Sequence, residues 1–135
     1  MTTEERTNLA ARLGFRPDQV VQEIGYDDDA DQELRGSIEK ITGRELVDEE
    51  YDDHVDALVQ WFRDGDGDLS NTMTDAIGAL EDGGVIWLLT PKPERDNHVE
   101  PSDIREAAQT AGLSMSKTID AASDWSGTRL VVPKR

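Results

Sequence analysis

The sequence predicts an α/β protein with a mostly parallel sheet that ends in an antiparallel hairpin. The first observation behind this prediction is the stretch 83–91, read Gly-Gly-Val-Ile-Trp-Leu-Leu-Thr-Pro. Glycines and a proline bound its apolar run and β-branched residues open it, which favours a central strand buried on both faces over a helix. The second observation is that strand-like and helix-like segments alternate before this strand, as in parallel sheets. The third is the two alternating segments within residues 114–132, which are typical of a hairpin.

The remaining elements follow from periodicity and stop signals along the chain. These signals predict helices at residues 3–13, 31–43, 68–82 and 101–112, and strands at 19–25, 45–48, 54–62, 114–121 and 128–132, with a turn at 124–127. In the strand at 54–62, Val55, Ala57, Val59 and Trp61 share one face. Segment 45–48 has only two apolar residues, so its place in the sheet stays open.

Each predicted helix combines an apolar stripe with a glycine that ends it. In the helix at 31–43, Leu34, Ile38 and Ile41 form the stripe and Gly43 is the stop. The stops of the other three helices are Gly14, Gly83 and Gly112. Aspartates at positions 27, 28, 29 and 31 come just before the helix at 31–43. Negative charge at a helix start is stabilised by the helix dipole, so most of this acidity has a structural explanation.

Charge and composition exclude several classes of function. The chain of 135 residues carries 30 acidic and 14 basic residues, a net charge of -16. Because this field repels phosphates and anionic headgroups, nucleic acid and membrane surfaces are not expected as partners. The chain has no cysteine, so it has no disulfide and no thiolate nucleophile. Without a long apolar stretch or a signal-peptide pattern at the first residues, a cytoplasmic location is expected.

Three stretches resemble parts of the class I S-adenosylmethionine-dependent methyltransferase fold. Residues 13–25 resemble its first motif, in which a turn leads into a strand that ends in an acid, an apolar residue and glycine. Residues 80–89 resemble its late helix-to-strand junction, and the terminal hairpin resembles its last two strands. More narrowly, residues 23–29, 87–92 and 124–129 together resemble a small actinobacterial family catalogued only as a domain of unknown function.

This resemblance implies a single Rossmann-like three-layer domain over residues 1–135. It places Glu23, Gly25 and Tyr26 where the superfamily's first motif meets its cofactor, and it matches Asp48 to the acid that binds the cofactor ribose. The narrower family carries no established activity.

The chain departs from the methyltransferase pattern where the cofactor would bind. Glycines in that loop let the backbone approach the ligand, but here Gly25 stands alone and three aspartates follow Tyr26. Their carboxylates repel the carboxylate of the cofactor's methionine portion, so no S-adenosylmethionine binding is expected. The connection from Asp48 to Val55 is also too short for the strand and helix that normally intervene, so part of the cofactor wall would be absent.

Metal and nucleophile motifs are weak. Residues 64–68, Asp-Gly-Asp-Gly-Asp, are similar to the start of a calcium loop, but position six is Leu69 and position twelve is Asp75 instead of glutamate. Asp68 as a helix cap explains the pattern without metal, and no metal ligands are assigned. Weak magnesium binding at residues 27–31 is the remaining metal alternative. No serine stands in a nucleophile elbow, so no catalytic residue is assigned.

The predicted parallel sheet brings three segments to one edge. Residues 25–28, 61–66 and 90–98 all leave strands at their carboxyl ends, where open α/β sheets bind ligands. The expected rim for a ligand or partner consists of Trp61, Arg63, Lys92, Arg95 and His98. Its basic residues either take part in binding or offset nearby aspartates. Replacing Trp61 or Lys92 by alanine is expected to weaken binding and leave the fold intact.

These observations favour a non-catalytic cytoplasmic protein that acts by binding at the carboxyl edge of its sheet. The occupant of that edge is a protein partner, a second copy of the chain, or a small ligand. A methyltransferase with an atypical site is the first alternative, and a protein that binds a divalent metal is the second.

The excess of carboxylates predicts that salt stabilises this protein. Repulsion among like charges opposes the compact state, and salt screens it, so the thermal unfolding midpoint is expected to rise with sodium chloride. Calcium is expected to add no more than magnesium or sodium at equal ionic strength. A stabilisation that saturates at micromolar calcium and disappears in Asp66→Asn would instead establish a metal site at residues 64–75.

Overall fold

The computed structural model describes residues 13–122 and 124–133, except for the side chains of Glu81 and Asp82, and it contains one five-stranded sheet. The predicted helix at 3–13 lies almost wholly outside the described residues. In chain order the elements are β1 (Val21–Ile24), α2 (Gln32–Thr42), β2 (Val55–Trp61), α3 (Leu69–Ile77), β3 (Leu80–Pro91), α4 (Pro101–Ala111), β4 (Ser114–Asp120) and β5 (Trp125–Val131). The strand order is β1-β2-β3-β5-β4.

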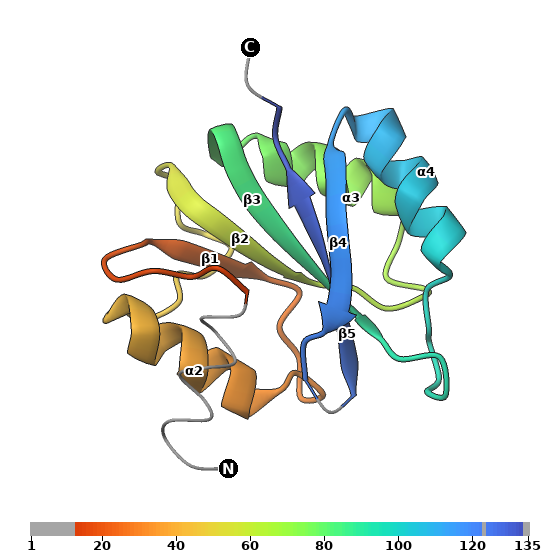
Figure 1. Cartoon of the computed structure of the whole chain (residues 1–135), viewed down its shortest axis with the longest axis horizontal. Coiled ribbons are helices and arrows are strands. Elements are labelled where there is room, and N and C mark those ends of the chain that lie inside the picture. Colours follow the sequence, from red (N-terminus) through yellow and green to blue (C-terminus); the bar gives the residue numbers. More distant parts are fainter. Residues whose placement is uncertain (1–12, 123, 134–135) are drawn as a thin grey trace.

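The sheet is parallel on one side and antiparallel on the other. Strand β1 pairs with β2, and β2 with β3, in parallel, whereas β5 runs antiparallel to both β3 and β4. Strand β3 is therefore the central strand, and the predicted mixed α/β sheet with a closing hairpin is confirmed. Helix α2 covers one face, while α3 and α4 cover the other (Figure 1).

Alternate residues of the central strands enter two separate cores. On the α2 side, Trp61 and Trp87 pack with Leu34 and Ile38 of α2. On the other side, the apolar residues of α3 and α4 pack against the sheet, and the cluster includes Leu58, Phe62, Ile86, Leu88, Met73, Ile104 and Ala108. A strand buried on both faces needs large apolar residues at every position, which explains the uninterrupted run in β3.

Three buried tryptophans tie loops to the sheet. Each indole N–H donates a hydrogen bond, from Trp87 to the carbonyl of Leu13 at 2.8 Å and from Trp125 to the carbonyl of Asp29 at 3.1 Å. The third, from Trp61, goes to the carboxylate of Glu23 at 2.9 Å. The rings of Trp61 and Trp125 meet edge to face with their centroids 4.8 Å apart. These side chains are core anchors that satisfy their own polar atoms.

The predicted helix caps are largely confirmed. The Asp31 carboxylate accepts from the Leu34 amide at the start of α2, and Gly43 ends that helix with φ 74°. The Asp68 carboxylate accepts from the Asn71 amide at the start of α3, as expected for a cap. At the end of α4, Gly112 has φ 78°.

The junction between α3 and β3 differs from the prediction. Helix α3 ends at Ile77 with Gly78 as its cap, five residues before the expected stop at Gly83. Leu80 opens β3 instead of closing the helix, because it pairs with Val55 of β2. Further along, the amide of Gly83 donates to the carbonyl of Val132 at 2.8 Å. Pairing partners on both sides therefore extend the strand through the glycine pair.

Two further segments differ in extent from the prediction. The sequence left the place of segment 45–48 open, and in the structure it contributes a single parallel bridge, between Val47 and Gln22 of β1. Trp125, predicted in a turn, is the first residue of β5 and pairs with Pro91. Its burial under the loop after β1 favours the strand over the turn.

The expectation that Trp61→Ala leaves the fold intact is wrong, because Trp61 is fully buried in the α2-side core. Removing the indole leaves a cavity and takes a donor from Glu23, so we expect a loss of about 3–5 kcal/mol in the free energy of unfolding. Urea denaturation measures this loss. Trp61→Phe, which keeps most of the ring, should lose less. A loss below about 1 kcal/mol for Trp61→Ala would contradict this packing.

Candidate functional site

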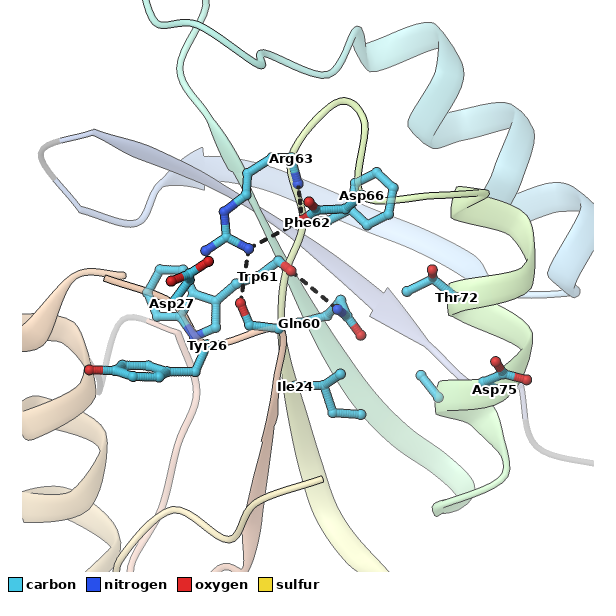
Figure 2. Close-up of a pocket in the computed structure, with 12 residues that line it drawn as sticks. Ile24, Tyr26, Asp27, Gln60, Trp61, Phe62, Arg63, Asp66, Thr72 and Asp75 are labelled. Carbon is cyan, nitrogen blue, oxygen red and sulfur yellow. Dashed lines mark hydrogen bonds and ion pairs between the residues drawn. The ribbon is translucent and has the colours of Figure 1, made fainter. Parts of the chain in front are cut away.

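The three parallel strands end at one edge of the sheet, as predicted. Strands β1 and β2 end at Ile24 and Trp61, and the loops that follow them meet at this edge. Figure 2 shows the residues around the pocket there, with Tyr26 and Asp27 on the loop after β1 and Thr72 and Asp75 on α3. The carboxyl edge is therefore built from segments that are distant in the sequence.

The carboxylate of Glu23 is the most heavily bonded acid at the edge. It is only 7% exposed. Arg35 of α2 forms a two-point ion pair with it, at 2.6 and 2.9 Å, in addition to the bond from Trp61. This pairing raises the pKa of Arg35. The Arg35 guanidinium also lies 4.3 Å from the ring centroid of Tyr26. The acid of the methyltransferase-like motif thus joins β1 to β2 and α2.

Gly25 is held tightly by the residues around it. Its φ is 80°, and a Cβ placed on it would lie 2.3 Å from the carbonyl oxygen of Trp61. Its amide donates to the Glu49 carboxylate at 2.8 Å, and its carbonyl accepts from Arg63 at 2.9 Å. Glycine is required here because strand β2 approaches so closely. Both backbone polar groups of Gly25 are therefore bonded within the chain.

Arg63 closes the loop after β1 onto the end of β2. Its guanidinium donates to the Asp29 carboxylate through Nε at 2.9 Å and through Nη2, and to Asp66 through Nη1 at 3.2 Å. It also lies 5.3 Å from the Trp125 ring centroid. We call Arg63, Asp29 and Asp66 the arginine clamp. The hydrogen bond from Arg63 lowers the pKa of Asp29, and the same bond raises the pKa of Arg63.

The other basic residues of the expected rim also face carboxylates. Lys92 Nζ lies 3.6 Å from Asp120, and an Arg95 nitrogen lies 3.7 Å from Asp124. These contacts connect the loop after β3 to the last residue of β4 and to the turn between β4 and β5. These bases offset nearby aspartates, which was one of the two accounts expected from the sequence.

The remaining predicted site residues lie in separate places. Glu23, Tyr26 and Asp48 line a pocket of about 460 Å³ on the outer side of β1. His98 lines a different pocket, of about 150 Å³, between the sheet and α4, and its Nδ1 lies 2.7 Å from the carbonyl oxygen of Pro91. The structure therefore groups Gly25, Tyr26 and Arg63 in one pocket and separates His98 from them.

Gln60 is a site residue that the sequence reasoning missed. It is 5% exposed and lines the pocket between β1, β2 and α3. Its signal was present in the sequence, as a polar residue inside the apolar run Val59-Gln60-Trp61 of a central strand. Thr72 and Asp75 were also missed, because only the packing of α3 brings them to this pocket.

The described part of the chain contains neither a cluster of metal ligands nor a helix that could span a membrane. Within residues 13–122 and 124–133, no group of three histidine or acidic side chains is arranged to hold a metal ion. None of the helices described there has the length and apolar content needed to cross a bilayer.

The sequence matches a family model described as "Protein of unknown function (DUF3052)" over residues 10–134. The chain belongs to this family. An uncharacterized protein of Mycobacterium tuberculosis strain H37Rv is 46% identical over 134 residues, which cover 99% of this chain and 84% of the relative. An uncharacterized protein of Mycobacterium bovis matches with the same identity and coverage. The expected membership of an actinobacterial family of unknown function is thus confirmed.

Solved structures similar to this chain include methyltransferases. A SAM-dependent methyltransferase from Aquifex aeolicus superposes with a TM-score of 0.62 at 11% identity, covering 95% of this chain and 89% of that one. The mitomycin 7-O-methyltransferase MmcR gives a TM-score of 0.69 at 11% identity, covering 96% of this chain and 53% of that one. The chain likewise spans 54% of the pyocyanin biosynthetic protein PhzM. At this identity the likeness shows the fold alone, and the Rossmann-like methyltransferase fold is confirmed.

The arginine clamp predicts a specific acid sensitivity. Because the pKa of Asp29 is lowered from its ordinary value of 3.8, its pairing stabilises the fold fully above about pH 4. This stabilisation is lost as the pH falls through the lowered value. Asp29→Asn should therefore unfold more easily than the natural chain at pH 6, and the difference should shrink below pH 4. Urea denaturation at a series of pH values measures both proteins. A difference that stays constant from pH 6 to pH 2.5 would contradict the pairing.

Proposed function

We propose that this protein is a non-catalytic binding protein that uses the methyltransferase fold without its cofactor. Its binding surface is the carboxyl edge of β1 and β2, and the occupant is a protein partner or a small ligand. The cytoplasmic location expected from the composition belongs to the same proposal. Nucleic acid and membrane surfaces are not among the proposed partners, because the net charge of -16 repels them.

This proposal rests on one observation: polar groups at the carboxyl edge are already hydrogen-bonded to other residues of the chain. The amide and carbonyl of Gly25 are bonded to Glu49 and Arg63, at 2.8 and 2.9 Å. Glu23, the acid of the motif, is bonded to Arg35 and Trp61. A cofactor that needed these groups would have to break bonds within the fold before forming its own. Binding in the space that remains does not carry that cost.

A second observation concerns the wall that a cofactor ribose would meet. Asp48 lies in the pocket outside β1, and only Val47 of its segment pairs with the sheet. The backbone carbonyl of Asp48 accepts a hydrogen bond from the side-chain amide of Gln22 at 3.0 Å. A single bridge replaces a full strand on this side, so the wall that a strand would give to an adenosine is incomplete, although a pocket is present there. The proposal of a cofactor-free protein agrees with this geometry.

The test is direct titration with S-adenosylmethionine. We expect no heat of binding by calorimetry and no rise in the thermal unfolding midpoint at millimolar cofactor. A ligand present at 100 times its dissociation constant would stabilise the fold by about 2.7 kcal/mol, which is readily detected. A methyltransferase that binds the cofactor serves as the positive control. A saturable isotherm with a micromolar dissociation constant would contradict the proposal and favour an enzyme.

A further inference from the structure

A pocket of about 450 Å³ opens between the ends of β1 and β2 and helix α3. Its volume falls in the range of small-ligand sites. Both apolar side chains, such as Ile24 and Phe62, and polar groups line it. The polar lining residues are Tyr26, Asp27, Gln60, Arg63, Asp66, Thr72 and Asp75.

Gln60 supplies the most specific feature of this pocket. Its amide nitrogen donates to the carbonyl oxygen of Trp61 at 3.2 Å. This bond sets the orientation of the amide, because two facing oxygens would repel each other. In Figure 2 the amide oxygen points away from Trp61 and toward the α3 side of the pocket. Within the described residues, this oxygen is the one buried side-chain polar atom that has no hydrogen-bond partner.

A buried acceptor without a donor is rare in folded proteins and destabilises them. The chain could have avoided this cost with an apolar residue at position 60, like its neighbours Leu58 and Val59. A ligand that donates an N–H to Gln60 would supply the missing bond after a small rotation of the side chain. The unpaired oxygen therefore indicates an N–H or O–H donor as the occupant.

The charges around the pocket select among possible donors. Asp27, Asp66 and Asp75 line it, against the single cation of Arg63. The charge of Arg63 is already shared between Asp66 and Asp29. Asp75 is exposed on α3 at the mouth of the pocket. The remaining negative charge favours a cation and repels a carboxylate or phosphate.

We propose that this pocket binds a small organic cation with N–H donors, a primary ammonium or a guanidinium. Gln60 Oε1 accepts one N–H, and Asp75 and Asp27 provide the opposing charge at the mouth. The inference rests on the proposed function and names the ligand class for the same edge. Neither acidity nor volume would suffice alone, and the unpaired amide oxygen is the independent observation that points to a donor.

The first experiment compares three probes by calorimetry and by backbone amide chemical shifts. Agmatine carries both an ammonium and a guanidinium, tetramethylammonium carries a positive charge without any hydrogen-bond donor, and acetate is an anion. We expect saturable binding of agmatine, with shifts in residues 24–27, 60–66 and 72–76. Tetramethylammonium has neither an N–H nor an O–H and cannot donate to Gln60, so it should bind at least about tenfold more weakly than agmatine, and acetate should not bind.

The second experiment uses matched variants of the whole chain. Gln60→Met keeps the length of the side chain and removes the acceptor, and it should weaken agmatine binding about tenfold. Asp75→Asn, at an exposed position that tolerates change, should weaken it through lost charge. Asp103→Asn removes an equal charge from the exposed first turn of α4 and should leave the affinity unchanged.

Several results would overturn this inference. These are the absence of saturable agmatine binding, equal affinity for agmatine and tetramethylammonium, or equal weakening by Asp75→Asn and Asp103→Asn. If Gln60→Met fails to fold, the comparison of Asp75→Asn with Asp103→Asn decides the outcome. Any of these results would exclude the cation as ligand but would not contradict the proposed cofactor-free binding protein. Tight S-adenosylmethionine binding would contradict the proposed function separately, so the two failures are distinguishable.

Discussion

The buried carboxylate of Glu23 holds together three parts of this fold. An ionised group removed from water is stable only with partners. Arg35 of α2 provides two charged hydrogen bonds and Trp61 of β2 provides a third. The end of β1, the end of β2 and the first turn of α2 must therefore take up fixed positions around one side chain. The cation of Arg35 in turn covers the ring of Tyr26.

In the arginine clamp, too, an arginine pairs with carboxylates and joins two segments, here the loops after β1 and β2. Arg63 joins the Asp29 carboxylate to the carbonyl of Gly25, so the loop after β1 cannot lift from β2 without losing several charged contacts. Trp125 of β5 reaches the same loop through the carbonyl of Asp29. The loop after β1 is thus tied to β2 and β5 by these bonds, although residues 26–29 are themselves exposed. The pocket between β1, β2 and α3 lies beside this loop.

Much of the fold could be predicted because local signals agree with the packing. Strand β3 carries a continuous apolar run, and α2 has both of its caps in the sequence. The end of α3 was predicted wrongly because Gly83 looks like a helix stop. Only the partners of Leu80 in β2 and of Gly83 beyond β5 show that a strand passes through it. Pairing between distant segments has no local signature.

The site was predictable only in outline. Parallel strands place their loops at one edge, which identified Gly25 and Arg63 correctly as neighbours. The sequence could not show that Trp61 is fully buried, because a tryptophan at a strand end faces either the core or the rim. It also could not show which aspartate pairs with which base. Those pairings depend on distances set by the packing of α2 and β5.

In this fold the polar groups of the methyltransferase-like motif form structural bonds within the chain. The most direct measurement is urea denaturation of Glu23→Gln, Arg35→Gln and the double variant. Arg35→Gln leaves the buried Glu23 carboxylate without its cation and should lose about 3 kcal/mol of unfolding free energy. Glu23→Gln leaves the partly exposed Arg35 without its anion and should lose less, about 1–2 kcal/mol. The double variant should lose clearly less than the sum, because the two residues contact each other. A Glu23→Gln protein within about 0.5 kcal/mol of the natural chain would contradict the account.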